Sequence, residues 1–156
     1  MQPSTKLHSR LIEDCIPLGE FPLCMLLLLD DSHFPWFILV PKRDGITEIH
    51  QLTGDDQKQL LDESIYLSRC LEAVFKPDKL NIAALGNVVP QLHIHHIARF
   101  TSDACWPAPV WGAVAATPYA REDIILIRQQ LSDCFDSNKI QPFHWNDETG
   151  HHDEAD

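Results

Sequence analysis

Residues 53–77 carry the pattern that most restricts how this chain can fold. Apolar residues recur there at steps of three and four: Leu60, Leu61, Leu67, Leu71, Val74 and Phe75. This spacing places them on one face of an α-helix. Thr53, with Asp56 three positions later, is typical of a helix start, and Pro77 is typical of a helix end. The sequence therefore predicts one long amphipathic helix in the middle of the chain.

Strand patterns lie on both sides of this helix. Residues 21–29 and 36–40 have no polar side chains, and the short polar turn between them favours an antiparallel pair. Residues 80–85 and 90–100 predict further strands, and residues 119–135 predict a second helix. The fold class predicted is α+β. We expect an antiparallel sheet of about five strands, with the long helix and the C-terminal helix packed on it.

The totals limit the size and the partners of this domain. The length of 156 residues favours a single domain, which we place at residues 1–140. Residues 141–156 are acidic and predict a flexible tail. The net charge of −11 argues against nucleic acid as a partner, because phosphate backbones are bound by clustered Lys and Arg.

The chain also lacks the patterns of membrane and exported proteins. Its longest apolar run, residues 21–29, is too short to span a bilayer, and no signal-peptide pattern precedes it. Its five cysteines are odd in number and show no C-x-x-C spacing, as expected of small buried residues in a reducing compartment. We expect a cytoplasmic protein with no membrane partner.

Polar side chains gather on one face of the strand predicted at residues 90–100. Alternation along a strand puts Gln91, His93, His95 and Arg99 on one side, whereas His96 points to the other. Polar groups on an otherwise apolar strand are costly unless they are satisfied or used. This face is therefore the candidate functional site.

Nucleophilic catalysis is the first chemistry that these residues suit. A neutral imidazole is a competent nucleophile toward phosphorus near pH 7, and His93 or His95 could form a covalent phosphoryl intermediate. Donors such as Gln91, His95 and Asn87 would then stabilise the charge that develops on the phosphoryl oxygens.

Two other uses of the histidines remain open at this point. His93 and His95 could hold a metal ion together with His96, His33 or His50, although His96 points away from the other two. The histidines could also be satisfied polar groups in a crowded strand, without a chemical role.

Residues 86–99, which read G-N-V-V-P-Q-L-H-I-H-H-I-A-R, resemble the signature of the histidine triad (HIT) family. That signature is His-x-His-x-His followed by two apolar residues, with a glycine five residues before the first histidine. Gln91 stands at the first histidine position, His93 at the second and His95 at the third. Gly86 has the expected spacing.

A second segment extends the resemblance. Residues 35–42, P-W-F-I-L-V-P-K, resemble the family's upstream strand P-x-H-x-L-V-I-P-K, with Trp36 in place of its histidine. The long helix falls between the two segments, as the family's fold requires. The Q-x-H-x-H-H arrangement and the tryptophan- and proline-rich loop at residues 106–112 resemble a bacterial branch of the family.

The resemblance implies an enzyme that cleaves a nucleoside monophosphate from its substituent, as a hydrolase or a nucleotidyl transferase. It implies that His93 attacks the α-phosphorus and that His95 contacts phosphate oxygens or the bridging position. Gln91 would complete the catalytic set from the place of the first histidine. The resemblance implies neither a catalytic metal nor another cofactor, and it implies a homodimer with sheets paired edge to edge.

The resemblance also implies substrate-binding residues. Asn81 and Asn87 would lie near the phosphate, and Asp30 or Asp31 would hold the ribose hydroxyls. Arg99 shares the histidine face and would meet either a phosphate or an acidic partner.

Two departures from the family pattern keep a second hypothesis open. Gln91 and Trp36 each replace a histidine, and neither side chain can take up a proton. The alternative function is therefore a catalytically weak nucleotide-binding protein on the same fold. A metal-binding domain built on His93 and His95 is the third hypothesis. The loop at residues 106–112 either covers the nucleotide site or a dimer surface, or packs over the sheet edge.

Overall fold

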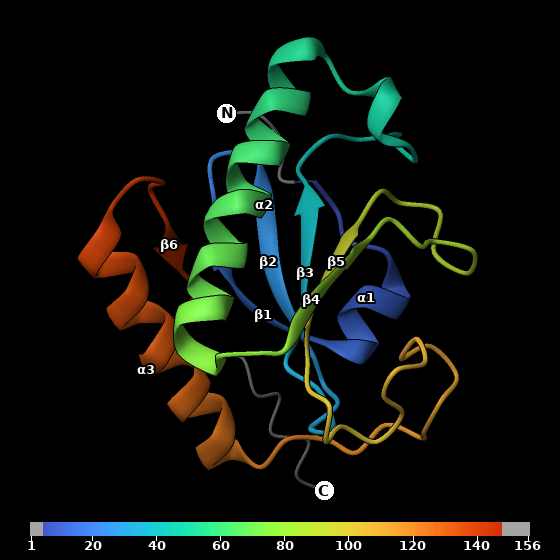
Figure 1. The fold of residues 1–156 in the computed structure, drawn as a ribbon. Helices are drawn as coiled ribbons and strands as arrows, with labels where there is room; N and C mark the ends of the chain where they lie inside the picture. Colours follow the sequence, from blue (N-terminus) through green and yellow to red (C-terminus); the bar gives the residue numbers. More distant parts are fainter. Residues whose placement is uncertain (1–4, 148–156) are drawn as a thin grey trace, which may run out of the picture.

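A six-stranded sheet dominates the described part of the chain, and all its neighbouring strands are antiparallel (Figure 1). The computed structural model describes residues 5–147. The strands are β1 (Cys15–Glu20), β2 (Cys24–Leu29), β3 (Trp36–Pro41), β4 (Lys79–Ala83), β5 (Ile94–Arg99) and β6 (His144–Trp145). Their order across the sheet is β4-β5-β3-β2-β1-β6.

Three α-helices accompany this sheet: α1 (Ser9–Asp14), α2 (Gly54–Phe75) and α3 (Arg121–Asn138), with a 3-10 turn at Ile49–Gln51. The long helix begins as its sequence predicts, because the hydroxyl of Thr53 accepts a hydrogen bond from the backbone N–H of Asp56. It ends at Phe75, and the next residue, Lys76, has a left-handed backbone. The α+β class with an antiparallel sheet is confirmed, with six strands in place of about five.

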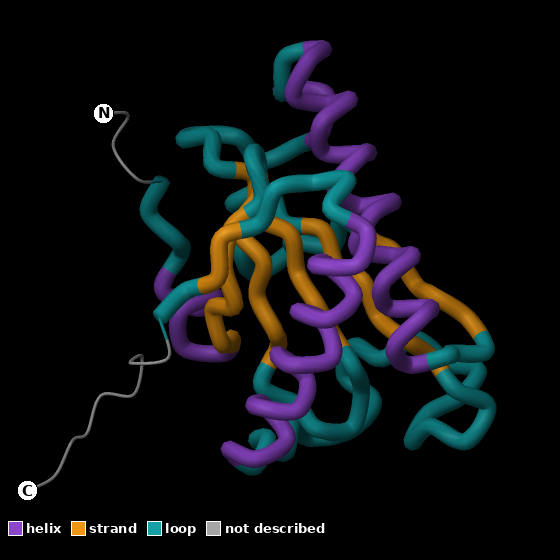
Figure 2. Tube along the Cα trace, turned by 90° about the vertical axis from the view of Figure 1, so that its left-hand side faces the viewer, coloured by secondary structure: helices purple, strands orange, loops and turns teal. Residues whose placement is uncertain are grey.

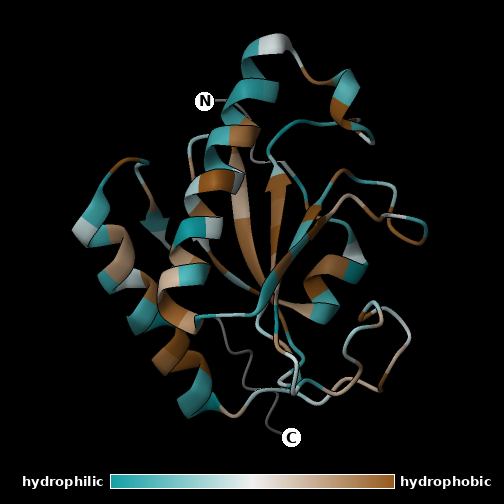
Figure 3. Ribbon diagram, in the orientation of Figure 1, coloured by the Kyte–Doolittle hydropathy of each residue, from teal (hydrophilic) through white to brown (hydrophobic). Residues whose placement is uncertain are grey.

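The central strands β2, β3 and β5 are largely buried on both faces of the sheet, and their side chains alternate between the two faces. Phe37 and Ile94 belong to the face that packs under α2 and α3, whereas Trp36, Ile38 and Ile97 belong to the face near α1. Figure 2 shows the strands between the long helices and the short helix near the N-terminus. Figure 3 shows that β2 and β3 are hydrophobic along their length, whereas α2 is mixed. Strands covered on both sides need such continuous apolar runs.

The histidine strand is shorter than its sequence predicts. β5 begins at Ile94, so His93 lies just before it. The backbone N–H of Leu92 donates to the carbonyl of Ile46, at 2.9 Å, and not to the neighbouring strand β4. Residues 84–93 therefore form a loop between β4 and β5, and this loop carries the central histidine of the motif.

The last described residues return to the sheet. Residues 141–147 fall in the segment that the sequence assigns to a tail, yet β6 pairs with β1 there through Trp145 and Gly19. Phe143 and Trp145 also pack against the core beneath α3. The rest of the predicted tail, residues 148–156, lies outside the described residues.

Candidate active site

His93 lies between two hollows at the end of β5. Its Nδ1 is 2.7 Å from the backbone carbonyl of Gln91. Because a carbonyl oxygen can only accept, Nδ1 carries the hydrogen and Nε2 keeps its lone pair in the neutral ring. The side chain is only 6 % exposed, yet it lines both hollows. The geometry therefore fixes which nitrogen carries the hydrogen in the neutral ring, and the ring lies beside space for a ligand.

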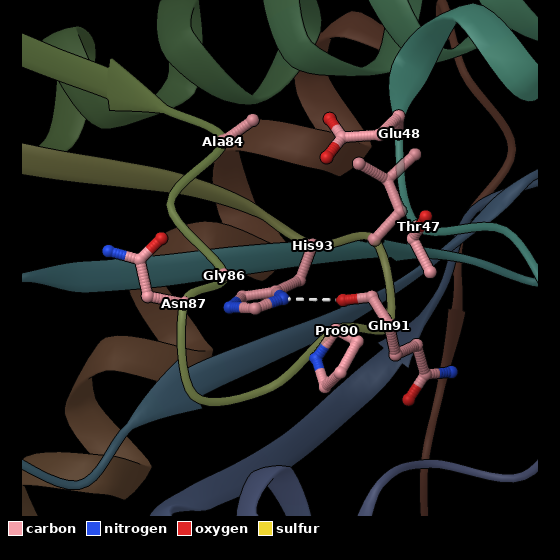
Figure 4. Close-up of a pocket in the computed structure, with 9 residues that line it drawn as sticks. Thr47, Glu48, Ala84, Gly86, Asn87, Pro90, Gln91 and His93 are labelled. Carbon is pink, nitrogen blue, oxygen red and sulfur yellow. Dashed lines mark hydrogen bonds between the residues drawn. The ribbon is translucent and has the colours of Figure 1, made fainter.

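The first hollow has a volume of about 300 Å³ and a mainly polar lining (Figure 4). It lies between the loop that carries Gly86 and Asn87 and the segment that carries Thr47 and Glu48. The ring of His93 lies between these two walls, with its hydrogen bond to the Gln91 carbonyl. Glu48 and Thr47 had no signal in the sequence, because they follow β3 in a polar turn of ordinary composition.

Gly86 allows the loop to approach the imidazole. A Cβ atom at this position would lie 2.6 Å from the carbonyl oxygen of Val89 and 3.2 Å from Cε1 of His93. The first distance is too short for any side chain, so only glycine fits here without moving the backbone. The glycine spacing noted in the sequence thus has a steric cause next to His93.

The second hollow, of about 240 Å³, is mainly apolar. It lies on the other side of His93 and is walled by α1 through Leu11, by β3 through Trp36 and Ile38, and by the later loop through Trp111. Such a lining suits the base and sugar of a nucleoside better than it suits a highly charged group.

His95 is held by hydrogen bonds on both of its nitrogens. Nδ1 is 2.9 Å from the indole Nε1 of Trp36, and Nε2 is 3.0 Å from the carbonyl oxygen of Leu85. Burial lowers the pKa of His95 to about 4, so the ring is neutral at neutral pH. The centroids of the His93 and His95 rings are 4.9 Å apart, closer than the roughly 7 Å expected of alternate residues in a strand. The rings approach because His93 precedes the strand.

His96 faces the opposite side of the sheet, as the alternation predicts. Its Nε2 is 2.7 Å from the hydroxyl of Ser64 on α2, and its Nδ1 is 3.1 Å from the carbonyl of Ile94. Burial lowers the pKa of His96 to about 4. His96 is therefore a satisfied polar group in the core and not a third member of the His93 and His95 pair.

Gln91 takes part in the site through its backbone, while its side chain points elsewhere. The side-chain oxygen accepts from the N–H of His8 at 2.8 Å, and the side-chain nitrogen is 3.2 Å from the carbonyl of Lys6. The amide thus binds the segment that leads into α1, whose residues wall the apolar hollow.

Arg99 and Asn81 form a separate cluster toward the other end of β5. The guanidinium of Arg99 is 1 % exposed and binds both carboxylate oxygens of Asp103, the side-chain oxygen of Asn81 and the carbonyl of Ala108. The hydrogen bonds that it donates lower the pKa of Asp103 to about 2. Of the two readings of Arg99, the structure shows the ion pair. Neither Arg99 nor Asn81 lines the two hollows at His93.

Asp30 and Asp31 bind the chain that precedes α3. Asp30 accepts from the N–H of Tyr119 at 2.8 Å, and Asp31 accepts from the N–H of Thr117 at 3.2 Å. Asp31 also lies 2.6 Å from Nδ1 of His33. These carboxylates do not line either hollow, whereas exposed Asn87 lines both. Of the predicted residues, the structure brings His93, His95, Gln91 and Asn87 together.

Neither a metal cluster nor a membrane helix is found in the described chain. Between residues 5 and 147, no three His, Cys, Asp or Glu side chains are placed so that they could hold a metal ion. Over the same residues, no helix is both long and apolar enough to cross a bilayer.

Known proteins share this fold and this sequence. A family model described as HIT domain matches residues 10–102. A histidine triad protein from Bradyrhizobium japonicum is 46% identical, with a TM-score of 0.82, and the match covers 84% of this chain and 98% of that one. One from Marinobacter aquaeolei is 44% identical, with a TM-score of 0.83, over 86% of this chain and 98% of the other. No protein of curated function matches the chain.

A third structure agrees with these two. The histidine triad protein from Sinorhizobium meliloti is 40% identical, with a TM-score of 0.81, and the match covers 83% of this chain and 96% of that one. The family model spans more than half of the chain and includes both strands of the site. The chain therefore belongs to the HIT domain family, whose members are generally nucleotide hydrolases or transferases.

Proposed function

We propose that this protein is a nucleotide hydrolase or nucleotidyl transferase that works through a covalent intermediate on His93. One observation carries the proposal: the Gln91 carbonyl occupies Nδ1 of His93 and leaves the Nε2 lone pair available beside two hollows. The ring needs no other base to become nucleophilic, because a neutral imidazole already has the lone pair. Family membership supports the nucleotide as substrate.

The reaction then takes two displacements at phosphorus. In the first, Nε2 attacks the α-phosphorus, and the P–N bond forms as the bond to the leaving group breaks. The leaving group departs with the bonding electrons and takes a proton from water. In the second, water or an acceptor hydroxyl attacks, the P–N bond breaks, and its electrons return to Nε2 as the nucleophile loses its proton.

The two hollows suggest how a nucleotide is held. The apolar hollow between α1 and Trp111 takes the nucleoside, and the polar hollow near Asn87 and Thr47 takes the phosphate and its substituent. Asn87 is exposed and lines both hollows, so its amide is the donor that we assign to the phosphoryl oxygens. The overall negative charge of the chain favours a small nucleotide over a nucleic acid.

The surroundings of the enzyme belong to the same proposal. We expect a cytoplasmic homodimer that needs no metal or other cofactor. The edge strand β4 supports the dimer, because it has a paired strand on one side only.

Mass spectrometry tests the nucleophile directly. The chelated protein is mixed with adenosine 5′-phosphoramidate, quenched in base and mapped by peptides. An adenosine monophosphate adduct on the peptide that contains His93 is expected, and it should be absent in His93→Ala. His50→Ala is the matched control, because His50 is exposed on the 3-10 turn and lines neither hollow.

The alternative function predicts different results. If neither adduct nor turnover appears although adenosine monophosphate binds, the protein is a nucleotide-binding relative, as the replacement of two histidines by Gln91 and Trp36 would allow. If turnover persists in His93→Ala, the assigned nucleophile is wrong.

A further inference from the structure

We propose that Trp36 is a positioning residue that fixes His95 as a single neutral tautomer and, through it, holds the loop against His93. The upstream strand of the family carries a histidine at this position, so the role of an indole there has to be explained from this structure. The inference rests on the proposed function for its kinetic consequence, but not for the tautomer itself.

The tautomer follows from the two partners of the ring. An indole N–H can only donate, so Nδ1 of His95, at 2.9 Å from it, must present a lone pair. A backbone carbonyl can only accept, so Nε2, at 3.0 Å from the oxygen of Leu85, must carry the hydrogen. Both requirements name the same tautomer. A histidine at position 36 could donate or accept according to its own protonation, so it would not set the tautomer by itself.

The register of the sheet puts the indole in reach of this ring. Trp36 pairs with Ile97, and Ile38 pairs with His95, so Trp36 and His95 are diagonal neighbours on one face. The indole is buried and meets His95 edge to face, with ring centroids 5.6 Å apart. Trp111 packs edge to face against both rings, at 5.5 Å from Trp36 and 5.2 Å from His95. The three rings therefore fix one another in orientation.

The hydrogen bond from His95 connects these three rings to the loop that lies beside the proposed nucleophile, His93. Its acceptor, Leu85, directly precedes Gly86, where an added Cβ atom would lie 3.2 Å from Cε1 of His93. A loop anchored at Leu85 keeps Gly86 and Asn87 at the edge of the polar hollow. Trp36 thus acts on the site through His95 and Leu85 without touching His93.

The surroundings of His95 offer it no acidic hydrogen-bond partner. His93 faces it from the loop just before the strand, and the apolar hollow beside it also carries Arg10, Asp14 and Cys15. Arg10 and Asp14 pair with each other at 3.2 Å, and burial raises the pKa of Cys15 to about 12, so this thiol is neutral. Removing the indole N–H leaves Nδ1 free to take a proton, and a charged His95 would then stand beside His93.

Nitrogen-15 NMR of the imidazoles tests the tautomer. Wild-type His95 should show a protonated Nε2 and an unprotonated Nδ1 from pH 8 down to pH 5. In Trp36→Phe, which keeps an aromatic ring without the N–H, the Leu85 carbonyl still requires the hydrogen on Nε2, but Nδ1 loses its donor and can take a proton, so the pKa of His95 should rise. Trp111→Phe is the matched control. The Trp111 indole also packs against the His95 ring but donates no hydrogen bond to it, so this variant should leave the tautomer of His95 unchanged.

Kinetics with adenosine 5′-phosphoramidate adds the functional arm. Trp36→Phe should lower kcat by roughly tenfold at pH 6 and by less at pH 8, because only the acidic range charges His95. A wild-type His95 with a protonated Nδ1, or a Trp36→Phe variant in which the pKa of His95 is unchanged, would overturn the proposal. If Trp36→Phe fails to fold, the wild-type spectrum still shows whether Nδ1 of His95 is unprotonated, as the proposal requires. An inactive wild type with the expected tautomer contradicts only the proposed reaction.

Discussion

Two buried imidazoles, those of His95 and His96, tie the stability of this protein to pH. Burial lowers the pKa of each to about 4, against an ordinary value of 6.5. Between these values the unfolded chain binds protons that the folded chain excludes, so the free energy of unfolding rises with pH in this window. This contribution to the free energy of unfolding is lost as the pH falls from 6.5 toward 4.

Urea unfolding at several pH values measures this effect. Each histidine contributes a slope of about 1 kcal/mol per pH unit between pH 6 and pH 5, so the pair gives roughly 2 kcal/mol over that unit. His96→Gln keeps a polar partner for Ser64 and should halve the slope. An unchanged slope in that variant would contradict the assignment. Asp103 does not confuse the result, because its pKa of about 2 confines its own effect to pH below 4.

At the scale of single elements, the Gln91 side chain holds the N-terminal segment in place. Its two hydrogen bonds to Lys6 and His8 join residues that lie more than eighty positions away in the sequence. α1 follows at once and walls the apolar hollow, so the amide fixes a wall of the proposed nucleoside site. Each of these bonds contributes about 1 kcal/mol.

Gln91→Ala should therefore loosen α1. Amide hydrogen exchange in residues 8–12 is expected to accelerate roughly thirtyfold, because the two lost bonds together contribute about 2 kcal/mol and about 1.4 kcal/mol corresponds to a factor of ten. KM for the nucleotide should rise more than kcat falls, since the backbone carbonyl that orients His93 remains. Gln129→Ala is the control, because this side chain bonds only Asp133 on the surface of α3. Unchanged exchange in Gln91→Ala would show that the segment is held by other contacts.

How far the sequence reaches at this scale depends on the range of each interaction. Local spacing predicted α2 and the separation of His96 from His93 and His95, because helix and strand periods are set within a few residues. The sequence did not show where along the strand the hollows lie. Arg99 was therefore assigned to the histidine face, although it lies too far along the strand to line either hollow. β6 was missed because two residues carry no period. The contact between Trp36 and His95 could not be predicted, because it depends on the register of β3 and β5, which only the folded sheet defines.

At the scale of the whole molecule, apolar side chains are exposed beside the site. Ile82 on β4 is 52 % exposed, and Leu85 and Val88 in the following loop are 37 % and 76 % exposed. Among residues 5–147, β4 pairs with a strand on one side only, so its outer edge is a template for pairing with a second copy. A two-fold pair through β4 would cover this loop, which lines both hollows at His93. We therefore expect dimerisation and activity to be linked.

Ile82→Lys tests this link, because a charge on the edge strand opposes pairing with a second copy. Sedimentation velocity should show a dimer for the wild type and a monomer for the variant, and kcat/KM should fall together with the dimer fraction. Ile125→Lys on α3 is the matched control, since Ile125 is exposed to the same degree on another face and its charge should leave the dimer intact. A wild-type monomer with full activity would contradict the expectation. So would an Ile82→Lys dimer whose activity is unchanged, because charge at β4 would then have no bearing on assembly or on the loop that positions Asn87 beside His93.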